Sequence, residues 1–84
     1  MVTFQQFAKM DLPHRSACLI NYGTWLSVMK AETGGRSLYA IGDFYAEMYY
    51  DHENNQILTI VPFRRTIHLE DWLQRIDLEE LLNQ

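Results

Sequence analysis

The segment that decides the fold is SLYAIGDFYAEMYY, residues 37–50. Two runs of alternating side chains flank Gly42 and Asp43. A two-residue connection that contains glycine is a strong signal for a tight antiparallel hairpin, because glycine accepts the positive φ that such a turn requires. With this turn, Ile41 lies opposite Phe44, and the pairing of all earlier and later residues follows. The sequence therefore predicts an antiparallel sheet built outward from this hairpin.

The two faces of this hairpin carry different kinds of side chain, because successive residues of a strand point to opposite sides. One face, here named the Phe44 face, carries Ser37, Tyr39, Ile41, Phe44, Ala46 and Met48. The other, named the tyrosine face, carries Arg36, Leu38, Ala40, Tyr45, Glu47 and Tyr49. The pairing puts Glu47 opposite Leu38 and diagonal to Arg36. We expect helices to cover the Phe44 face.

Two further strands extend the sheet. Residues 24–30 alternate, with Trp25, Ser27 and Met29 expected on one side of a strand. After the polar turn 51–55, residues 56–61 form the fourth strand, and a shift of one residue in its register would exchange the faces of its central side chains. Pro62 has no backbone donor, so it either ends this strand or places it at a sheet edge.

Helices are predicted on both sides of the strands. Thr3 with Gln6 fits a capping box for a short helix, and a second helix runs from residue 11 to 22 and ends at Gly23. The apolar stripe of the second helix is expected to contain Leu12, Ser16, Leu19 and Ile20. Thr66 is a candidate N-cap for a third helix, followed by a further short helix from Asp77. The third helix has apolar residues at i, i+3, i+4 and i+7, namely Leu69, Trp72, Leu73 and Ile76.

The predicted fold class is α+β, in a single domain that spans residues 1–84. A four-stranded antiparallel meander is packed on one face by the N-terminal and C-terminal helices, in the order ααββββα with room for a further short C-terminal helix. The core contributors expected on that face are Phe4, Phe7, Leu69, Trp72 and Leu73.

The charge and composition of the chain limit the classes of partner and the cellular locations that are expected. Seven basic and eleven acidic residues give a net charge of −4, which does not favour nucleic acid or anionic lipid as a partner. The sequence shows no apolar run of membrane-spanning length and no export signal, and it has one cysteine, Cys18. A chain that cannot form an internal disulfide fits a reducing compartment, so a cytoplasmic location is expected.

No motif for catalysis, metal or cofactor binding stands out, and no catalytic residue, metal ligand or cofactor is predicted. His14 precedes Cys18 by one helical turn, but a thiolate–imidazole pair needs an orienting third group and oxyanion donors. Asp51, His52 and Glu53 at a turn are better explained by local hydrogen bonds than by a metal. Arg64 and Arg65 could hold an anion, although two cations among many acids do not make a nucleic-acid site.

Part of the sequence resembles a pattern in small uncharacterised bacterial proteins. The matching residues are 38–45, Glu47, Tyr50, Asp51, Asn55, Ile57, Phe63, Arg64, Leu69, Leu73 and 76–78. The resemblance covers the C-terminal half to two-thirds of the chain. It implies the hairpin, the closing helix and a bacterial cytoplasmic protein, and it brings no activity or site residue with it.

The tyrosine face is the best functional candidate in the sequence, because tyrosine and arginine are enriched in interface cores. We expect a small non-enzymatic protein that acts by association, as a homodimer or other homo-oligomer or with another protein. The interface candidates are Trp25, Arg36, Leu38, Tyr45, Glu47, Tyr49 and Arg64. The alternatives are a plain solvated sheet face, a regulatory or toxin-neutralising partner protein, and a small enzyme or ligand-binding protein. The last would place its pocket between the sheet and the N-terminal helices, with His14, Cys18, Glu47 or His68 as polar groups.

Overall fold

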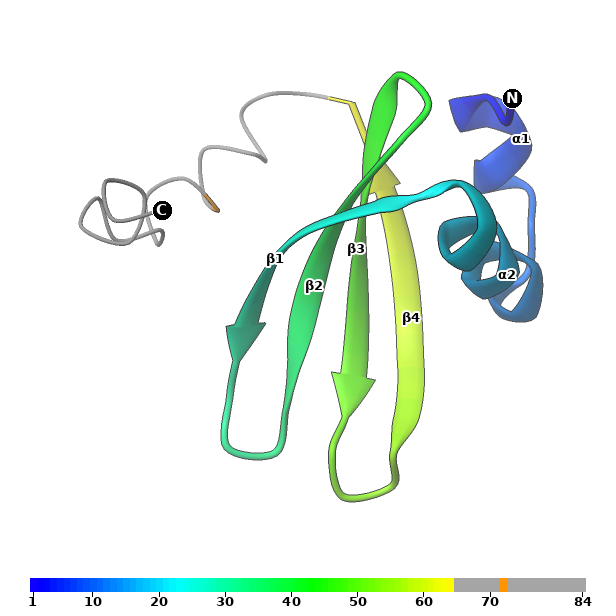
Figure 1. Cartoon of the computed structure of the whole chain (residues 1–84). Helices are drawn as coiled ribbons and strands as arrows, with labels where there is room; N and C mark the ends of the chain where they lie inside the picture. Colours follow the sequence, from blue (N-terminus) through cyan, green and yellow to red (C-terminus); the bar gives the residue numbers. More distant parts are fainter. Residues whose placement is uncertain (65–71, 73–84) are drawn as a thin grey trace, which may run out of the picture.

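The computed structural model describes residues 1–64 and Trp72, and it has the α+β architecture predicted from the sequence. Its elements are α1 (Phe4–Ala8), α2 (Leu12–Tyr22), β1 (Thr24–Lys30), β2 (Gly34–Ile41), β3 (Phe44–Asp51) and β4 (Gln56–Phe63). The four strands form one antiparallel meander in the order β1-β2-β3-β4 (Figure 1). The two helices predicted after Thr66 lie outside the described residues, apart from Trp72.

The central hairpin has the predicted register. Ile41 pairs with Phe44, and Leu38 pairs with Glu47. Gly42 has a φ of 58°, while Asp43 is not among the residues with positive φ. A positive φ at the first turn position alone is the pattern of a type II′ turn, which matches the twist of the flanking strands. The glycine is therefore needed at this position for its backbone conformation.

The fourth strand is longer than predicted and runs through Pro62 to Phe63. Its register pairs Met48 with Ile60, and an irregularity between Tyr49 and Tyr50 shifts the pairing nearer the turn. Pro62 pairs with Ala46, and among the strands that the structure describes β4 has β3 as its single neighbour. Of the two predicted roles for the proline, the edge-strand role is therefore confirmed.

The first strand contains a β-bulge that the alternating sequence pattern does not reveal. Trp25 pairs with Tyr39, but Ser27 pairs with Leu38, so one extra residue lies between the two pairs. Cross-strand partners share a face, which places Trp25 with Tyr39 on the Phe44 face and Ser27 with Leu38 on the tyrosine face. The prediction that Trp25, Ser27 and Met29 share one side was therefore wrong for Trp25.

Both helices begin as predicted. Thr3 and Gln6 form a complete capping box, and Asp11 caps α2 by accepting a hydrogen bond from the His14 amide. At Gly23 the φ is −85°, so this residue does not use the left-handed conformation. A Cβ there would lie 2.6 Å from the carbonyl oxygen of Leu19, so glycine is required for close approach of the backbone.

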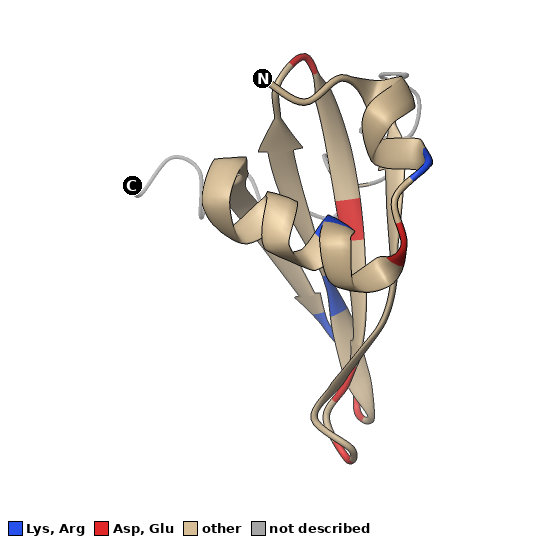
Figure 2. Ribbon diagram, turned by 90° about the vertical axis from the view of Figure 1, so that its right-hand side faces the viewer, with Lys and Arg blue, Asp and Glu red and all other residues tan. Residues whose placement is uncertain are grey.

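The helices cover the Phe44 face of the sheet, with α2 lying across it (Figure 2). The buried residues of this core are Phe7, Cys18, Leu19, Ile41, Phe44, Ala46 and Ile60. Ile20 was expected in the same stripe, but its side chain is 79% exposed. Arg15, one turn before Leu19, is half-buried, so the buried stripe of α2 extends toward Arg15 and leaves Ile20 at its exposed side.

Arg15 joins three elements through one guanidinium group. Its nitrogens donate to the carbonyl oxygens of Phe7 and Ala8 at the end of α1 and to that of Ile60 on β4. The Phe7 carbonyl also accepts from the Met10 amide, whereas the Ile60 carbonyl lies on the outer side of β4. Arg15 therefore fixes α1 and α2 against the outer edge of β4. No helix among residues 1–64 is long and apolar enough to cross a membrane.

Candidate functional site

The tyrosine face is packed by a second buried cluster around Trp72. Leu38, Phe63 and Trp72 are buried together, and Met29 and Tyr45 pack against them. Trp72 is 1% exposed. The sequence prediction placed it with Phe4 and Phe7 on the Phe44 face, and this was wrong: helical periodicity shows that one side of a helix is apolar, but not which face of the sheet it meets. The tyrosine face is thus partly covered from within the same chain.

Trp72 is held on this face by a carboxylate. The indole Nε1 donates a hydrogen bond to Oε1 of Glu47 at 2.9 Å, and the Tyr49 hydroxyl donates to Oε2 at 2.5 Å. Nη1 of Arg36 lies 3.6 Å from the same Oε2. We name these four residues the Glu47 network. It brings together three of the predicted interface candidates and one residue that was predicted elsewhere.

The charges of the network compensate one another in a half-buried setting. The Arg36 guanidinium carbon lies 5.2 Å from the centroid of the Trp72 ring, within range of a cation–π contact. The side chains of Arg36 and Glu47 are only 21% and 13% exposed, so each charge needs the other. Burial, followed by hydrogen bonding to Glu47, raises the pKa of Tyr49, and Arg36 opposes this shift.

This arrangement suits a structural role better than proton transfer. Both oxygens of Glu47 accept hydrogen bonds, and the Tyr49 proton is held more tightly than in water. A general base needs an oxygen that can reach a substrate proton, and neither oxygen is left without a donor. The network therefore fixes Trp72 against the sheet.

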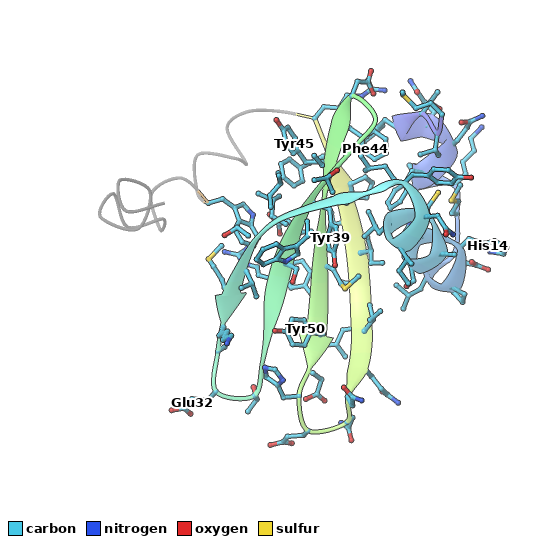
Figure 3. The ribbon with its side chains drawn as sticks, in the orientation of Figure 1. His14, Glu32, Tyr39, Phe44, Tyr45 and Tyr50 are labelled. Carbon is cyan, nitrogen blue, oxygen red and sulfur yellow. The ribbon has the colours of Figure 1, made fainter. Side chains whose placement is uncertain are left out.

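The remaining interface candidates lie in different places. Tyr45 stacks on Phe63 with ring centroids 5.6 Å apart. Arg64 lies over the ring of Phe4, with its guanidinium carbon 4.4 Å from the centroid. Figure 3 shows Phe44 directed toward the helices and Tyr45 directed to the other side of the sheet. Trp25 is 57% exposed, and it lies on the Phe44 face.

The residues proposed for the alternative pocket are not brought together. Nδ1 of His14 contacts Oδ1 of Asp11, and the His14 side chain is 74% exposed, pointing away from the sheet (Figure 3). Cys18 is buried in the core of the Phe44 face, whereas Glu47 lies on the opposite face. His68 lies outside the described residues.

The polar turn between β3 and β4 shows the local hydrogen bonds that the sequence predicted. Oδ1 of Asp51 accepts from the backbone amide of Glu53, and Oδ2 accepts from the side chain of Asn54. Asn55 takes the left-handed conformation with a φ of 52°. Among residues 1–64 and Trp72, no three His, Cys, Asp or Glu side chains are placed to hold a metal ion.

An open hollow of about 690 Å³ lies at the end of the sheet where the β1–β2 and β3–β4 turns meet. Its lining includes Met29, Lys30, Arg36, Tyr49 and Tyr50. The backbone of Gly35 forms part of the wall, because a Cβ there would lie 2.6 Å from the Met29 carbonyl oxygen and 3.1 Å from the Tyr50 hydroxyl. This hollow is far from the predicted pocket, and neither His14 nor Cys18 lines it.

Two features with clear structural roles were missed in the sequence. No role was predicted for Arg15, and its position one turn after Leu12 in the buried stripe is the signal that could have identified it. Trp72 carries an indole donor that needs a partner when buried, and the predicted neighbours Phe4 and Phe7 offer none. That mismatch could have directed attention to Glu47 on the tyrosine face.

Comparisons of the chain with protein-family models, with curated proteins and with solved structures find no match. The functional argument therefore depends on the surfaces of the molecule itself.

Proposed function

We propose that this protein acts by self-association, as a small non-enzymatic domain that forms a homodimer. The observation that carries the proposal is a group of exposed apolar side chains where α2 passes into β1. Its members are Ile20, Tyr22, Trp25 and Leu26, exposed by 79%, 71%, 57% and 45%. We name this group the α2–β1 corner. Large exposed apolar groups gathered in one place are typical of association surfaces.

The sequence around the corner is also free of charge. Residues 16–29 contain no Lys, Arg, Asp or Glu, although such residues make up 21% of the chain. Interface cores are depleted in charged side chains and enriched in tyrosine and tryptophan. Figure 2 likewise shows acidic and basic positions scattered elsewhere, with acids marking the hairpin turns.

The proposal keeps the predicted mode of action but moves the surface. Arg36, Leu38, Glu47 and Tyr49 are engaged with Trp72 or with one another inside the chain. The Trp25 side chain makes no hydrogen bond and no ring contact with the described part of the chain. It is the candidate that is left for a partner.

The test is the mass of the protein in solution over a range of concentrations, by sedimentation equilibrium. We expect a dimer that dissociates on dilution, and a shift toward monomer in the double variant Trp25→Ser, Leu26→Ser. Ile57→Ser, Leu58→Ser is the matched control, because these two side chains are exposed apolar groups of β4, outside the corner. A wild-type chain that stays monomeric at the highest concentration contradicts self-association. A monomer that binds a different protein through Trp25 would replace the homodimer with a heteromeric function.

A further inference from the structure

The two outer edges of the sheet are not equivalent. β1 and β4 each have one hydrogen-bonded neighbour, so each presents a row of backbone groups to its outer side. Which groups point outward can be read from the pairing pattern, because alternate residues of an antiparallel strand face the neighbour and the solvent.

The outer edge of β4 is blocked. Ile41 and Phe44 flank the two-residue turn and form a hydrogen-bonded pair, so the backbone N–H and C=O groups of Phe44 point to β2. The backbone groups of residues 45, 47 and 49 therefore point to β4, and those of their β4 partners point back to β3. This leaves the backbone groups of Ile60 and Pro62 pointing to the outer side of β4. The Ile60 carbonyl oxygen accepts from Arg15, which agrees with this assignment. Pro62 has no amide proton to offer. Another strand therefore cannot continue the sheet along this part of β4.

The outer edge of β1 is not paired by any other described segment of the chain. The Ala31 amide donates to the Gly34 carbonyl oxygen, so the backbone groups of Ala31 point to β2. By alternation the backbone groups of Met29 and Ser27 also point to β2, and those of Val28 and Lys30 point to the outer side. No hydrogen bond to the outward backbone groups of Val28 or Lys30 is formed by residues 1–64 or Trp72. The regular part of this edge runs from Ser27 to Lys30, after the bulge.

We propose that a second copy of this chain pairs antiparallel with the outer edge of β1, joining two four-stranded sheets into one. This inference rests on the self-association proposed above and names its surface. Two identical strand edges can pair antiparallel about a two-fold axis, because each then offers the other the same backbone donors and acceptors. Since only one edge of the described sheet is available in each copy, the assembly stops at a dimer. The neighbouring Trp25 and Leu26 would then be covered in the same event.

The charge of Lys30 selects the position of the two-fold axis. An axis at Val28 places the two Lys30 residues four strand positions apart, about 13 Å along the strand direction. An axis at Met29 would make them diagonal neighbours, where like charges repel. With the axis at Val28, the two Val28 residues form a hydrogen-bonded antiparallel pair, with their Cα atoms about 5.5 Å apart.

The first test replaces an outward amide. Lys30→Pro removes a backbone donor that β2 does not use, and proline is tolerated at such edge positions. Lys30→Ala is the matched control, because it removes the same side chain and keeps the amide. We expect Lys30→Pro to raise the dimer dissociation constant at least about tenfold, as expected for the loss of interface hydrogen bonds, and Lys30→Ala to leave it unchanged or lower. Equal dissociation constants for both variants overturn the edge pairing.

The second test does not depend on the folding of the proline variant. Val28→Cys should form a disulfide-linked dimer under mild oxidation, because the expected Cα separation lies within disulfide range. Val61→Cys on β4 should stay uncrosslinked. A dimeric wild type whose Val28→Cys variant does not crosslink, or crosslinks no faster than Val61→Cys, overturns the edge pairing but leaves self-association standing. A wild type that is monomeric throughout removes both proposals and shows that the bulge and Lys30 protect this edge.

Discussion

On the Phe44 face of the sheet, aromatic rings are buried by one another, whereas on the tyrosine face an aromatic ring is buried against a charged pair. Phe7 and Phe44 meet with ring centroids 5.4 Å apart, and Phe4 meets Phe44 edge-on at 5.7 Å. Across the sheet, Trp72 meets Glu47 and Arg36. The first arrangement needs apolar volume, and the second needs particular partners at particular atoms.

The two arrangements should therefore respond differently to substitution. Apolar packing is lost roughly in proportion to the volume removed. A buried polar network is lost in steps, because removing one member leaves its partners without hydrogen bonds. Four substitutions, two on the tyrosine face and two on the side of the helices, test this difference.

The largest effect is expected at Phe44. Its side chain is 1% exposed and contacts rings from α1, so Phe44→Ala should lower the free energy of unfolding by about 3–5 kcal/mol. Urea unfolding measures the loss. Ile57→Ala on β4, a 36% exposed position, is the control and should change little. A loss at Phe44 no larger than that at Ile57 would show that α1 and α2 do not form the main core.

The next largest effect is expected at Glu47. Glu47→Ala leaves the Trp72 indole and the Tyr49 hydroxyl without their acceptor, which should cost about 1–3 kcal/mol. Glu47→Gln is the matched control, because its amide oxygen can still accept from the indole while its charge is lost. The free energy of unfolding of the Gln variant should lie between those of wild type and Glu47→Ala.

Tryptophan fluorescence reports the same change locally. In a Trp25→Phe background the emission comes from Trp72, which is 1% exposed and should therefore be blue-shifted and weakly quenched by acrylamide. Adding Glu47→Ala should shift the emission to the red and increase quenching. Unchanged emission in the Ala variant would mean that apolar contacts with Leu38 and Phe63 hold Trp72 without the carboxylate.

The difference between the faces also explains which predictions from the sequence were confirmed. The hairpin register follows from Gly42 and strand alternation, and the start of α1 follows from the capping box of Thr3 and Gln6; all of these are local signals. Because they depend on neighbouring residues only, the sequence determines them directly. The sheet order and the apolar Phe44 face were predictable for the same reason.

The predictions that were wrong concern relations between distant residues. The bulge near Leu26 moves Trp25 to the other face, and no turn residue or glycine marks it. The hydrogen bond between Glu47 and Trp72 joins residues 25 positions apart, and helical spacing alone does not select a sheet face. The sequence was enough to recognise the tyrosine face as a surface of unusual composition, but it did not show that Trp72 packs on it.

A smaller effect is expected from Tyr49, and it should grow at alkaline pH. The pKa of this hydroxyl is raised above its ordinary value of 10.0, so the folded protein holds the proton more tightly than the unfolded chain. The contribution of this hydroxyl to the free energy of unfolding is complete below pH 10, the pKa in the unfolded chain. It is lost as the pH rises through the higher pKa of the folded protein. Tyr49→Phe should cost about 1 kcal/mol at neutral pH and remove this alkaline loss.

The control for Tyr49 is Tyr22→Phe, since Tyr22 is 71% exposed and contacts no member of the network. Thermal unfolding midpoints measured from neutral to alkaline pH should fall in parallel for wild type and Tyr22→Phe, and less steeply for Tyr49→Phe. Parallel curves for all three proteins would show that Glu47 does not receive the Tyr49 proton in a hydrogen bond.

The smallest effect is expected on the side of the helices, at Asp11, and at acid pH. Hydrogen bonds from the His14 amide, and then from its ring, lower the pKa of Asp11 below the ordinary 3.8. The stabilisation is present at pH values above the pKa of Asp11 in the unfolded chain. It is lost as the pH falls through the lower pKa of Asp11 in the folded protein. Asp11→Asn keeps a capping oxygen but cannot titrate, so it should be less sensitive to acid than wild type, while Asp11→Ala should be less stable already at neutral pH. Helix content and unfolding midpoints measured between pH 7 and acid pH distinguish the three proteins. If Asp11→Asn loses stability in acid as steeply as wild type, the acid sensitivity does not come from Asp11.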